Sequence, residues 1–124
     1  MRLIVDGGAL IAIDRRDRTV GAILRLAQQE RVSIRTGGGV VAQVWRDGAR
    51  QSNVARILTG VTIEPIDGDT SKQGVLLAKS KTSDLVDAHV ALLAQSGDQV
   101  LTSDATDIRR PLRVRKVSAA IVRT

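Results

Sequence analysis

The stretch LIVDGG at residues 3–8 decides the fold of this chain. Its three apolar residues, two of them β-branched, predict a short strand that is buried on both faces. Asp6 follows where the strand must end, and the two glycines allow the backbone to turn away. In open α/β sheets, ligand sites form beyond the carboxyl ends of the strands. Asp6 is therefore either a turn residue or a ligand for a cation.

The stretch QVLTSD at residues 99–104 repeats this design, because an apolar strand is again followed by an acid, Asp104. The carboxyl ends of parallel strands share one edge of a sheet. We therefore expect Asp6 and Asp104 to meet at that edge, which is a stronger indication of a site than either acid alone.

Apolar runs typical of strands alternate with segments of helical spacing along the chain. This alternation predicts an α/β fold, a three-layer α/β/α sandwich with a mostly parallel sheet of four to five strands and right-handed crossovers. Further strands are expected at 32–35, 61–64, 100–102 and 113–117. Helices are expected at 9–13, 19–30, 40–46, 51–58, from Asp67 or Asp69 to 78, at 84–95, and at 104–109.

Three local signals set the expected boundaries. Thr19 is the expected N-cap of the helix at 19–30, and the run TGGG at 36–39 is expected to break the chain before the next helix. Pro111 is expected to end the helix at 104–109. The alternating charges at 113–117 then favour an edge strand, because charges there oppose further pairing.

Composition limits the classes of protein. A length of 124 residues predicts a single domain, 1–124. The absence of Cys excludes disulfides and thiolate metal sites, and a single Trp as the only aromatic residue argues against base-stacking surfaces. The net charge of +6 favours a polyanionic partner, either nucleic acid or an acidic protein. The chain has no apolar run of ~20 residues and no room for a signal peptide, so we expect a cytoplasmic protein without a membrane span.

Further acids accompany the two strand ends. Asp84 and Asp87 lie three residues apart, and hence on one face, near the start of the clearest predicted helix. Asp107 follows Asp104 at the same spacing. Each acid alone is explained by a turn, a helix cap or a helix start that resembles a capping box. Together, their convergence at one edge favours a site.

Clustered carboxylates repel one another, and a divalent cation makes such a cluster tolerable. Oxygen ligands without His or Cys select Mg²⁺ or Mn²⁺ over zinc. Such a metal deprotonates a bound water and stabilises charge on a phosphoryl group. An acidic metal site within a basic surface suits a nuclease. The candidates for holding the phosphate backbone are arginines: Arg46, Arg50, Arg109, Arg110, Arg113 and Arg115.

Other catalytic arrangements are excluded. His89 is the only His and points away from Asp87 on a helix, so we interpret it as structural or as a surface residue. No Ser-His-Asp or Cys-His set can be built from this sequence. The glycines at 37–39 lack the Lys-Ser/Thr of a phosphate-binding loop.

Four stretches together resemble the PIN-domain ribonucleases, and in particular the VapC-type toxins of bacterial toxin–antitoxin pairs. They are VDGGALI at 5–11, VAQVWR at 41–46, DLVDAHVA at 84–91 and LTSDATDI at 101–108, in the family's order over nearly the whole chain. The resemblance implies an RNA-cleaving enzyme that is a homodimer and is neutralised by an antitoxin whose tail enters the active groove. It also implies that Mg²⁺ or Mn²⁺ is held by Asp6, Asp87 and Asp104, with Asp107 and Asp84 as secondary contributors.

One position departs from the family pattern. Where the family has a Glu on the helix after the second strand, this chain has Gln43. Asp47, one turn further on, compensates only if the helix is rotated or bent. The sequence thus leaves two main hypotheses, a ribonuclease toxin and a PIN-like module that binds RNA or antitoxin without efficient cleavage. A phosphoacceptor receiver domain is a remote third, since Gly7 stands where receivers carry a second acid.

Overall fold

The computed structural model describes residues 1–45, 51–69, 72, 85–103 and 105–124. Its centre is a five-stranded sheet in the order β3-β2-β1-β4-β5, and each pair of neighbouring strands is parallel. The predicted parallel sheet is therefore confirmed, with β1 at its middle. The strands are β1 (Arg2–Val5), β2 (Ser33–Gly37), β3 (Val61–Glu64), β4 (Gln99–Thr102) and β5 (Ala120–Arg123).

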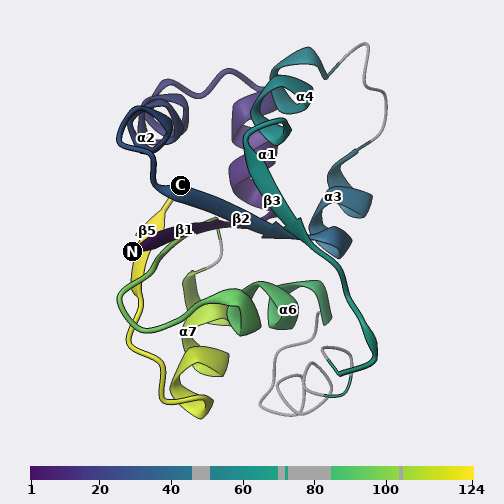
Figure 1. The fold of residues 1–124 in the computed structure, drawn as a ribbon, viewed down its shortest axis with the longest axis vertical. Coiled ribbons are helices and arrows are strands. Elements are labelled where there is room, and N and C mark those ends of the chain that lie inside the picture. Colours follow the sequence, from purple (N-terminus) through teal and green to yellow (C-terminus); the bar gives the residue numbers. More distant parts are fainter. Residues whose placement is uncertain (46–50, 70–71, 73–84, 104) are drawn as a thin grey trace.

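Helices cover both faces of this sheet (Figure 1). On one side α1 packs against α2 and α4, and on the other α6 packs against β1, β2 and α7. The three layers predicted from the sequence are thus confirmed, whereas the helix expected between Asp67 and residue 78 lies largely outside the described residues. The helices are α1 (Gly7–Asp14), α2 (Arg18–Gln29), α3 (Gly38–Val44), α4 (Ser52–Leu58), α6 (Leu85–Leu93) and α7 (Ala105–Val114).

The core is aliphatic and is built around β1. Leu3, Ile4 and Val5 are each at most 2% exposed, so β1 is buried on both faces as its composition predicts. Leu10 of α1 and Ile108 of α7 are fully buried in the same cluster. Each such side chain contributes about 1.5–3 kcal/mol relative to an exposed one. Burial of this strand therefore fixes the residue that follows it, at the end of the sheet.

The N-cap of α2 differs from the expected one. The side chain of Asp17 accepts a hydrogen bond from the backbone N–H of Val20 at 2.9 Å, so α2 begins at Arg18, and Thr19 lies within its first turn. Arg16 takes a left-handed φ of 60° and turns the chain between α1 and α2. The run TGGG at 36–39 also differs from the expected break in the chain, because β2 extends to Gly37 and α3 starts directly after it.

The prediction of a strand at 113–117 is wrong. Pro111 lies inside α7, which continues to Val114, and the edge strand is β5 at Ala120–Arg123. Ile108 and Leu112, four residues apart, are both buried, so packing of one helical face outweighs the hydrogen bond that Pro111 cannot donate. Beyond the helix, Lys116 takes a left-handed φ of 55°, and the chain turns towards β5.

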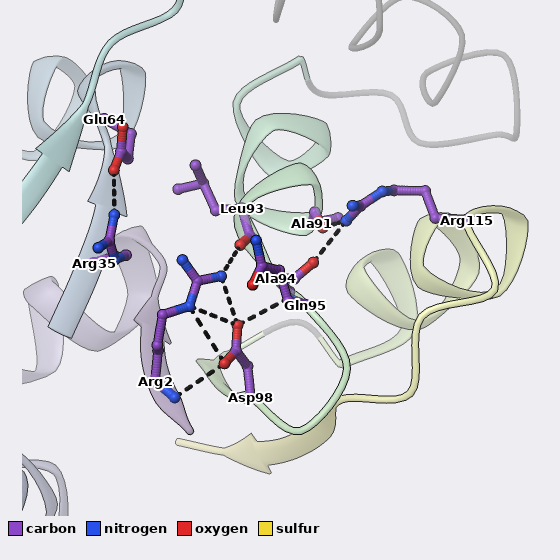
Figure 2. Close-up of polar contacts among 9 residues, drawn as sticks. All are labelled: Arg2, Arg35, Glu64, Ala91, Leu93, Ala94, Gln95, Asp98 and Arg115. Atoms are coloured by element: carbon purple, nitrogen blue, oxygen red, sulfur yellow. Dashed lines mark hydrogen bonds and ion pairs between the residues drawn. The ribbon is translucent and has the colours of Figure 1, made fainter. Parts of the chain in front are cut away.

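Two arginines tie the ends of elements together (Figure 2). Arg2, at the start of β1, forms an ion pair with Asp98 at 2.7 Å and donates to the carbonyl oxygen of Leu93 at 2.6 Å. Arg115 donates to the carbonyl oxygens of Ala91 and Ala94 at 2.7 and 2.8 Å. These bonds satisfy carbonyl groups that the end of α6 leaves without helical partners.

Burial alone would raise the pKa of Asp98. The hydrogen bonds from Arg2 and from the backbone N–H of Gln95, together with the charge of Arg2, outweigh it and hold the pKa of this carboxyl below its ordinary value. Asp98 thus anchors the amino end of the sheet as a charged residue.

Within the described ranges, no helix combines the length and apolarity needed to cross a membrane.

Candidate active site

The carboxyl edge of the sheet carries the first predicted site residue. Asp6 directly follows β1, and its backbone N–H donates to the carbonyl oxygen of Leu101 at 3.2 Å. The strand registers place Asp6 level with Thr102 of β4 and with Gly37 of β2. Glu64, at the end of β3, pairs with Gly37. Parallel pairing therefore aligns the ends of four strands at one edge.

Both carboxylate oxygens of Asp6 accept hydrogen bonds. Oδ1 accepts from the N–H of Ala9 at 3.0 Å, so Asp6 is the N-cap of α1, and Oδ2 accepts from the hydroxyl of Thr102. The residue is only 4% exposed. Burial raises the pKa of Asp6, although the hydrogen bonds from Thr102 and from the N–H groups of Ala9, Ser103 and Gly8 oppose the rise.

Asp6 is therefore both a helix cap and a potential ligand. Its role as a helix cap is shown by the hydrogen bond from the N–H of Ala9. A carboxylate offers about four lone-pair sites, and the bonds from Ala9 and Thr102 occupy one of them on each oxygen. The hydroxyl of Thr102 was missed by the sequence reasoning. Its signal was a polar residue at the last position of an otherwise apolar strand.

The segment after β4 packs directly on the first turn of α1. A Cβ added to Gly8 would lie 2.0 Å from Oγ of Ser103 and 2.5 Å from its Cβ, so only glycine permits this approach. Ser103 therefore lies beside the turn that Asp6 caps. Asp104, the next residue, lies outside the described residues, and its place in the site stays a prediction.

The first turn of α6 lies at the same edge. At the far end of this helix, the carbonyl oxygen of Leu93 accepts from Arg2 at the start of β1. At its near end, a methyl carbon of Val86 lies 3.1 Å from where a Cβ on Gly39 of α3 would stand. The helix thus runs antiparallel to the strands. Its first turn, which carries Asp87, lies at the carboxyl edge.

Gln43 occupies an exposed position on α3. The neighbouring Val44 and, one turn earlier, Val40 pack on α1, at 3.5 and 3.9 Å from the position of a Cβ on Gly7. This helix therefore flanks the turn that follows Asp6. Because α3 ends at Val44 and Trp45 is its extended C-cap, the helix does not continue towards Asp47, which lies outside the described residues.

His89 is buried, at 2% exposed, and its interpretation as a structural residue is the correct one. A Cβ on Gly37 would stand 2.6 Å from its Nδ1, which has no hydrogen-bond partner among the described residues. Burial lowers the pKa of His89, against the opposing charges of Glu64 and Asp67. The imidazole is therefore a neutral packing group between α6 and β2.

The structure describes only part of the remaining predicted set. Arg109, Arg110 and Arg113 are exposed on α7 and are available to a partner. Arg115 is not, because its guanidinium donates to the end of α6. Among the described side chains, no group of three or more His, Asp or Glu residues could hold a metal ion. Outside the described side chains lie Arg46, Arg50, Asp84, Asp104 and Asp107.

Comparison with known proteins agrees with this fold. No protein-family model and no curated protein matches the sequence. A chain from the crystal structure of VapBC2 from Rickettsia felis bound to a DNA fragment from their promoter superposes with a TM-score of 0.70, over 98% of this chain and 99% of that one. The two are 12% identical, so the likeness is one of fold. The α/β sandwich expected from the sequence is thus confirmed, and its fold is shared with that chain.

Proposed function

We propose that this protein is a metal-dependent endoribonuclease, which hydrolyses RNA phosphodiester bonds and acts as the toxin of a toxin–antitoxin pair. The observation that carries the proposal is the carboxyl edge of the sheet. Asp6, the hydroxyl of Thr102 and the α6 turn with Asp87 all belong to that edge. The fold shared with a chain of a VapBC complex supports the same class.

The donor set at this edge suits Mg²⁺ or Mn²⁺. Asp6 and Asp87 offer carboxylate oxygens, and we propose that Asp104 completes the set, with Asp84, Asp107 and the amide oxygen of Gln43 as secondary ligands. Burial raises the pKa of Asp6, so its charged form is disfavoured unless a cation lies nearby. When bound, the metal would supply a deprotonated water and charge stabilisation at the phosphoryl group.

The chain's own residues orient these groups. The hydroxyl of Thr102 and the N–H of Ala9 each hold one oxygen of Asp6, so its carboxylate is fixed in direction. The exposed Arg109 and Arg110 on α7 are proposed to bind the RNA backbone, since guanidinium groups make bidentate contacts with phosphate.

The partners follow from charge and from the shared fold. A net charge of +6 attracts RNA and also an acidic protein. We propose a cognate antitoxin, because the structural neighbour comes from a VapBC complex, and a homodimer as the family resemblance implies. The antitoxin would compete with RNA for the basic surface.

The test is cleavage of defined single-stranded RNAs by the purified protein in Mg²⁺ or Mn²⁺ and in EDTA. Cleavage is expected only with metal, and Asp87→Asn and Asp104→Asn are each expected to lower its rate at least a hundredfold. Glu30→Gln is the matched control, because it removes the same charge from an exposed residue at the C-cap of α2, just before the amino end of β2. Cleavage that survives both site substitutions would overturn the proposed site.

Gln43 favours a second candidate function, a PIN-like module that binds RNA or antitoxin without efficient cleavage. A neutral amide coordinates a cation through oxygen but adds no negative charge. If this module is the true function, wild-type protein binds RNA without cutting it, and Gln43→Glu gains metal-dependent cleavage. If the wild type already cleaves, Gln43→Glu is expected to tighten metal binding only.

A further inference from the structure

A pocket with a basic rim lies away from the proposed active site. The end of α1 and the facing sides of α2 and α4 enclose a pocket of about 360 Å³, here called the α2–α4 pocket. Ile13 is buried on its α1 side and Ile57 half-buried on its α4 side. Nothing lies within 4 Å of a Cβ built on Gly21, so the backbone of α2 is open to close approach there.

The rim of this pocket is strongly basic. Four exposed arginines line it, and within the described part of the chain none of them forms an ion pair. The one acid of the lining, Asp17, already accepts a hydrogen bond from Val20 as the cap of α2. The pocket thus offers unpaired guanidinium groups around an apolar centre. These arginines are Arg16, Arg18, Arg25 and Arg56.

We propose that the α2–α4 pocket holds one unstacked nucleotide of a single-stranded RNA, with the flanking phosphates on the arginine rim. This inference rests on the proposed function, in which RNA is the substrate. One guanidinium group can donate two parallel hydrogen bonds to two oxygens of the same phosphate. The apolar side chains accept the face of a base or ribose, and the amides of Gln28 and Asn53 supply donors and acceptors for its edge.

The position of the pocket gives it a role distinct from chemistry. Asp6 caps the start of α1, and Ile13 of the pocket lies in its last turn. The eight residues of α1 span about 12 Å. The RNA would therefore be held at two places, at the carboxyl edge where it is cut and at the far end of α1. Substrates long enough to reach both places are expected to bind most tightly.

An acidic peptide is the competing occupant, because carboxylates also pair with arginine. The placement of four arginines around a compact apolar centre favours a nucleotide, since a phosphodiester chain carries one phosphate on each side of every base. The experiment below includes such a peptide, so the two occupants give different results.

The first test fills the pocket without a change in charge. Gly21→Leu places a side chain in the open space of the pocket, and Gly68→Leu is the matched control, since a Cβ at Gly68 also meets nothing within 4 Å. Fluorescence anisotropy with a labelled 20-nucleotide single-stranded RNA in EDTA measures binding alone. Gly21→Leu is expected to weaken binding at least fivefold and Gly68→Leu to leave it unchanged.

The second test removes charge. Arg25→Gln with Arg56→Gln is compared with Arg31→Asn and Lys116→Asn, which remove two charges at exposed left-handed positions where Asn is tolerated. The slope of log K against log salt is expected to fall by about 1.4 for the pocket pair, or about 0.7 for each lost phosphate contact. The RNA affinity of the pocket pair is expected to drop about tenfold. The control pair is expected to change the affinity and the salt slope much less.

Equal effects of pocket and control variants would overturn the proposal. So would a Gly21→Leu protein that loses a 12-residue Glu/Leu peptide but keeps RNA. Cleavage in Mg²⁺ is measured separately. If the protein cleaves RNA but pocket and control variants bind RNA equally, the pocket proposal alone is overturned. If the pocket variants bind RNA more weakly than the controls but the protein does not cleave RNA, the nuclease proposal alone is overturned.

Discussion

The hydroxyl of Thr102 donates a hydrogen bond to Oδ2 of Asp6, and the two residues stand 96 positions apart in the chain. Both are buried, and both lie at the carboxyl ends of neighbouring strands. A hydrogen bond to a buried carboxylate lowers its pKa and fixes its direction. This contact therefore connects the stability of the sheet edge with the charge of the proposed ligand.

Thr102→Val is expected to raise the pKa of Asp6 further, because the hydroxyl that stabilises its charged form is lost. The acidic limb of the pH–activity profile should then move to higher pH, with a loss of about 1–3 kcal/mol in unfolding free energy. The measurement is cleavage rate against pH in Mg²⁺, with chemical denaturation alongside it.

Thr36→Val is the control for that experiment. Thr36 is equally buried and donates to the carbonyl oxygen of Val5 at 2.8 Å, but it is not among the groups whose hydrogen bonds shift the pKa of Asp6. It should lose stability without a shift of the pH profile. If both variants shift the profile alike, the bond to Asp6 does not set its pKa.

Asp6→Asn separates the charge of this residue from its role as a helix cap. Burial raises the pKa of Asp6, so the folded state binds the proton more tightly than the unfolded state. Its contribution to stability therefore falls as the pH rises from the ordinary carboxyl pKa through the folded one. Asn caps a helix as well as Asp does. The variant should be inactive, yet at pH 7 it should melt no lower than the wild type.

Added Mg²⁺ should raise the thermal stability of the wild type more than that of Asp6→Asn. A metal that binds only the folded state stabilises it, by about 2.7 kcal/mol at a hundred times its dissociation constant. Thermal melts with and without Mg²⁺ should show this increase for the wild type and little of it for Asp6→Asn. Equal stabilisation of both would contradict a metal site at Asp6.

Gly8→Ala is expected to disturb the segment that leads to Asp104. The new Cβ would collide with Ser103, which overpacks the site at a cost of about 1–3 kcal/mol. Cleavage should fall along with stability, and Ser103→Gly in the same protein should restore both, because it removes the colliding atoms. Denaturation curves and cleavage rates of the single and double variants measure this.

Gly7→Ala is the paired control, one position earlier in α1. Its Cβ would make an ordinary contact at 3.5 Å with Val44. Ala also favours a helix over Gly by about 0.5–1 kcal/mol. This variant should be at least as stable as the wild type. Similar losses in both variants would mean that α1, rather than its contact with Ser103, is the sensitive feature.

Asp98→Asn is expected to weaken the amino end of the sheet. Arg2 and Asp98 form an ion pair whose side chains are 22% and 4% exposed, so loss of its charged hydrogen bonds should cost about 1.5–3 kcal/mol at pH 7. The ion-paired Asp98 has a lowered pKa, so its contribution is present above the ordinary carboxyl pKa and is lost as the pH falls through the folded one.

The urea midpoints of wild type and Asp98→Asn should therefore converge at low pH. Asp17→Asn serves as the control, because this exposed cap is retained by Asn. A gap between the wild type and Asp98→Asn that stays constant from pH 7 to pH 2 would contradict the proposed charge of Asp98.

Periodicity was enough to predict most elements. The strands expected at residues 3–5 and 61–64 correspond to β1 and β3, because short runs rich in β-branched residues favour strands wherever they lie. The prediction was wrong around Pro111. Pro111 favours a helix end locally, but the burial of Ile108 and Leu112 on one face outweighs it, and that burial depends on tertiary packing.

The sequence by itself determined the layers, the parallel sheet and the placement of Asp6 at the end of β1. These follow from patterns within a few residues, since strand and helix periodicities are local properties. Tertiary structure alone decided that Thr102 donates to Asp6, that Ser103 fits only against Gly8, and that the turn with Asp87 reaches the same edge. These relationships join residues far apart in the chain, and only strand register and helix packing bring them to one edge of the sheet.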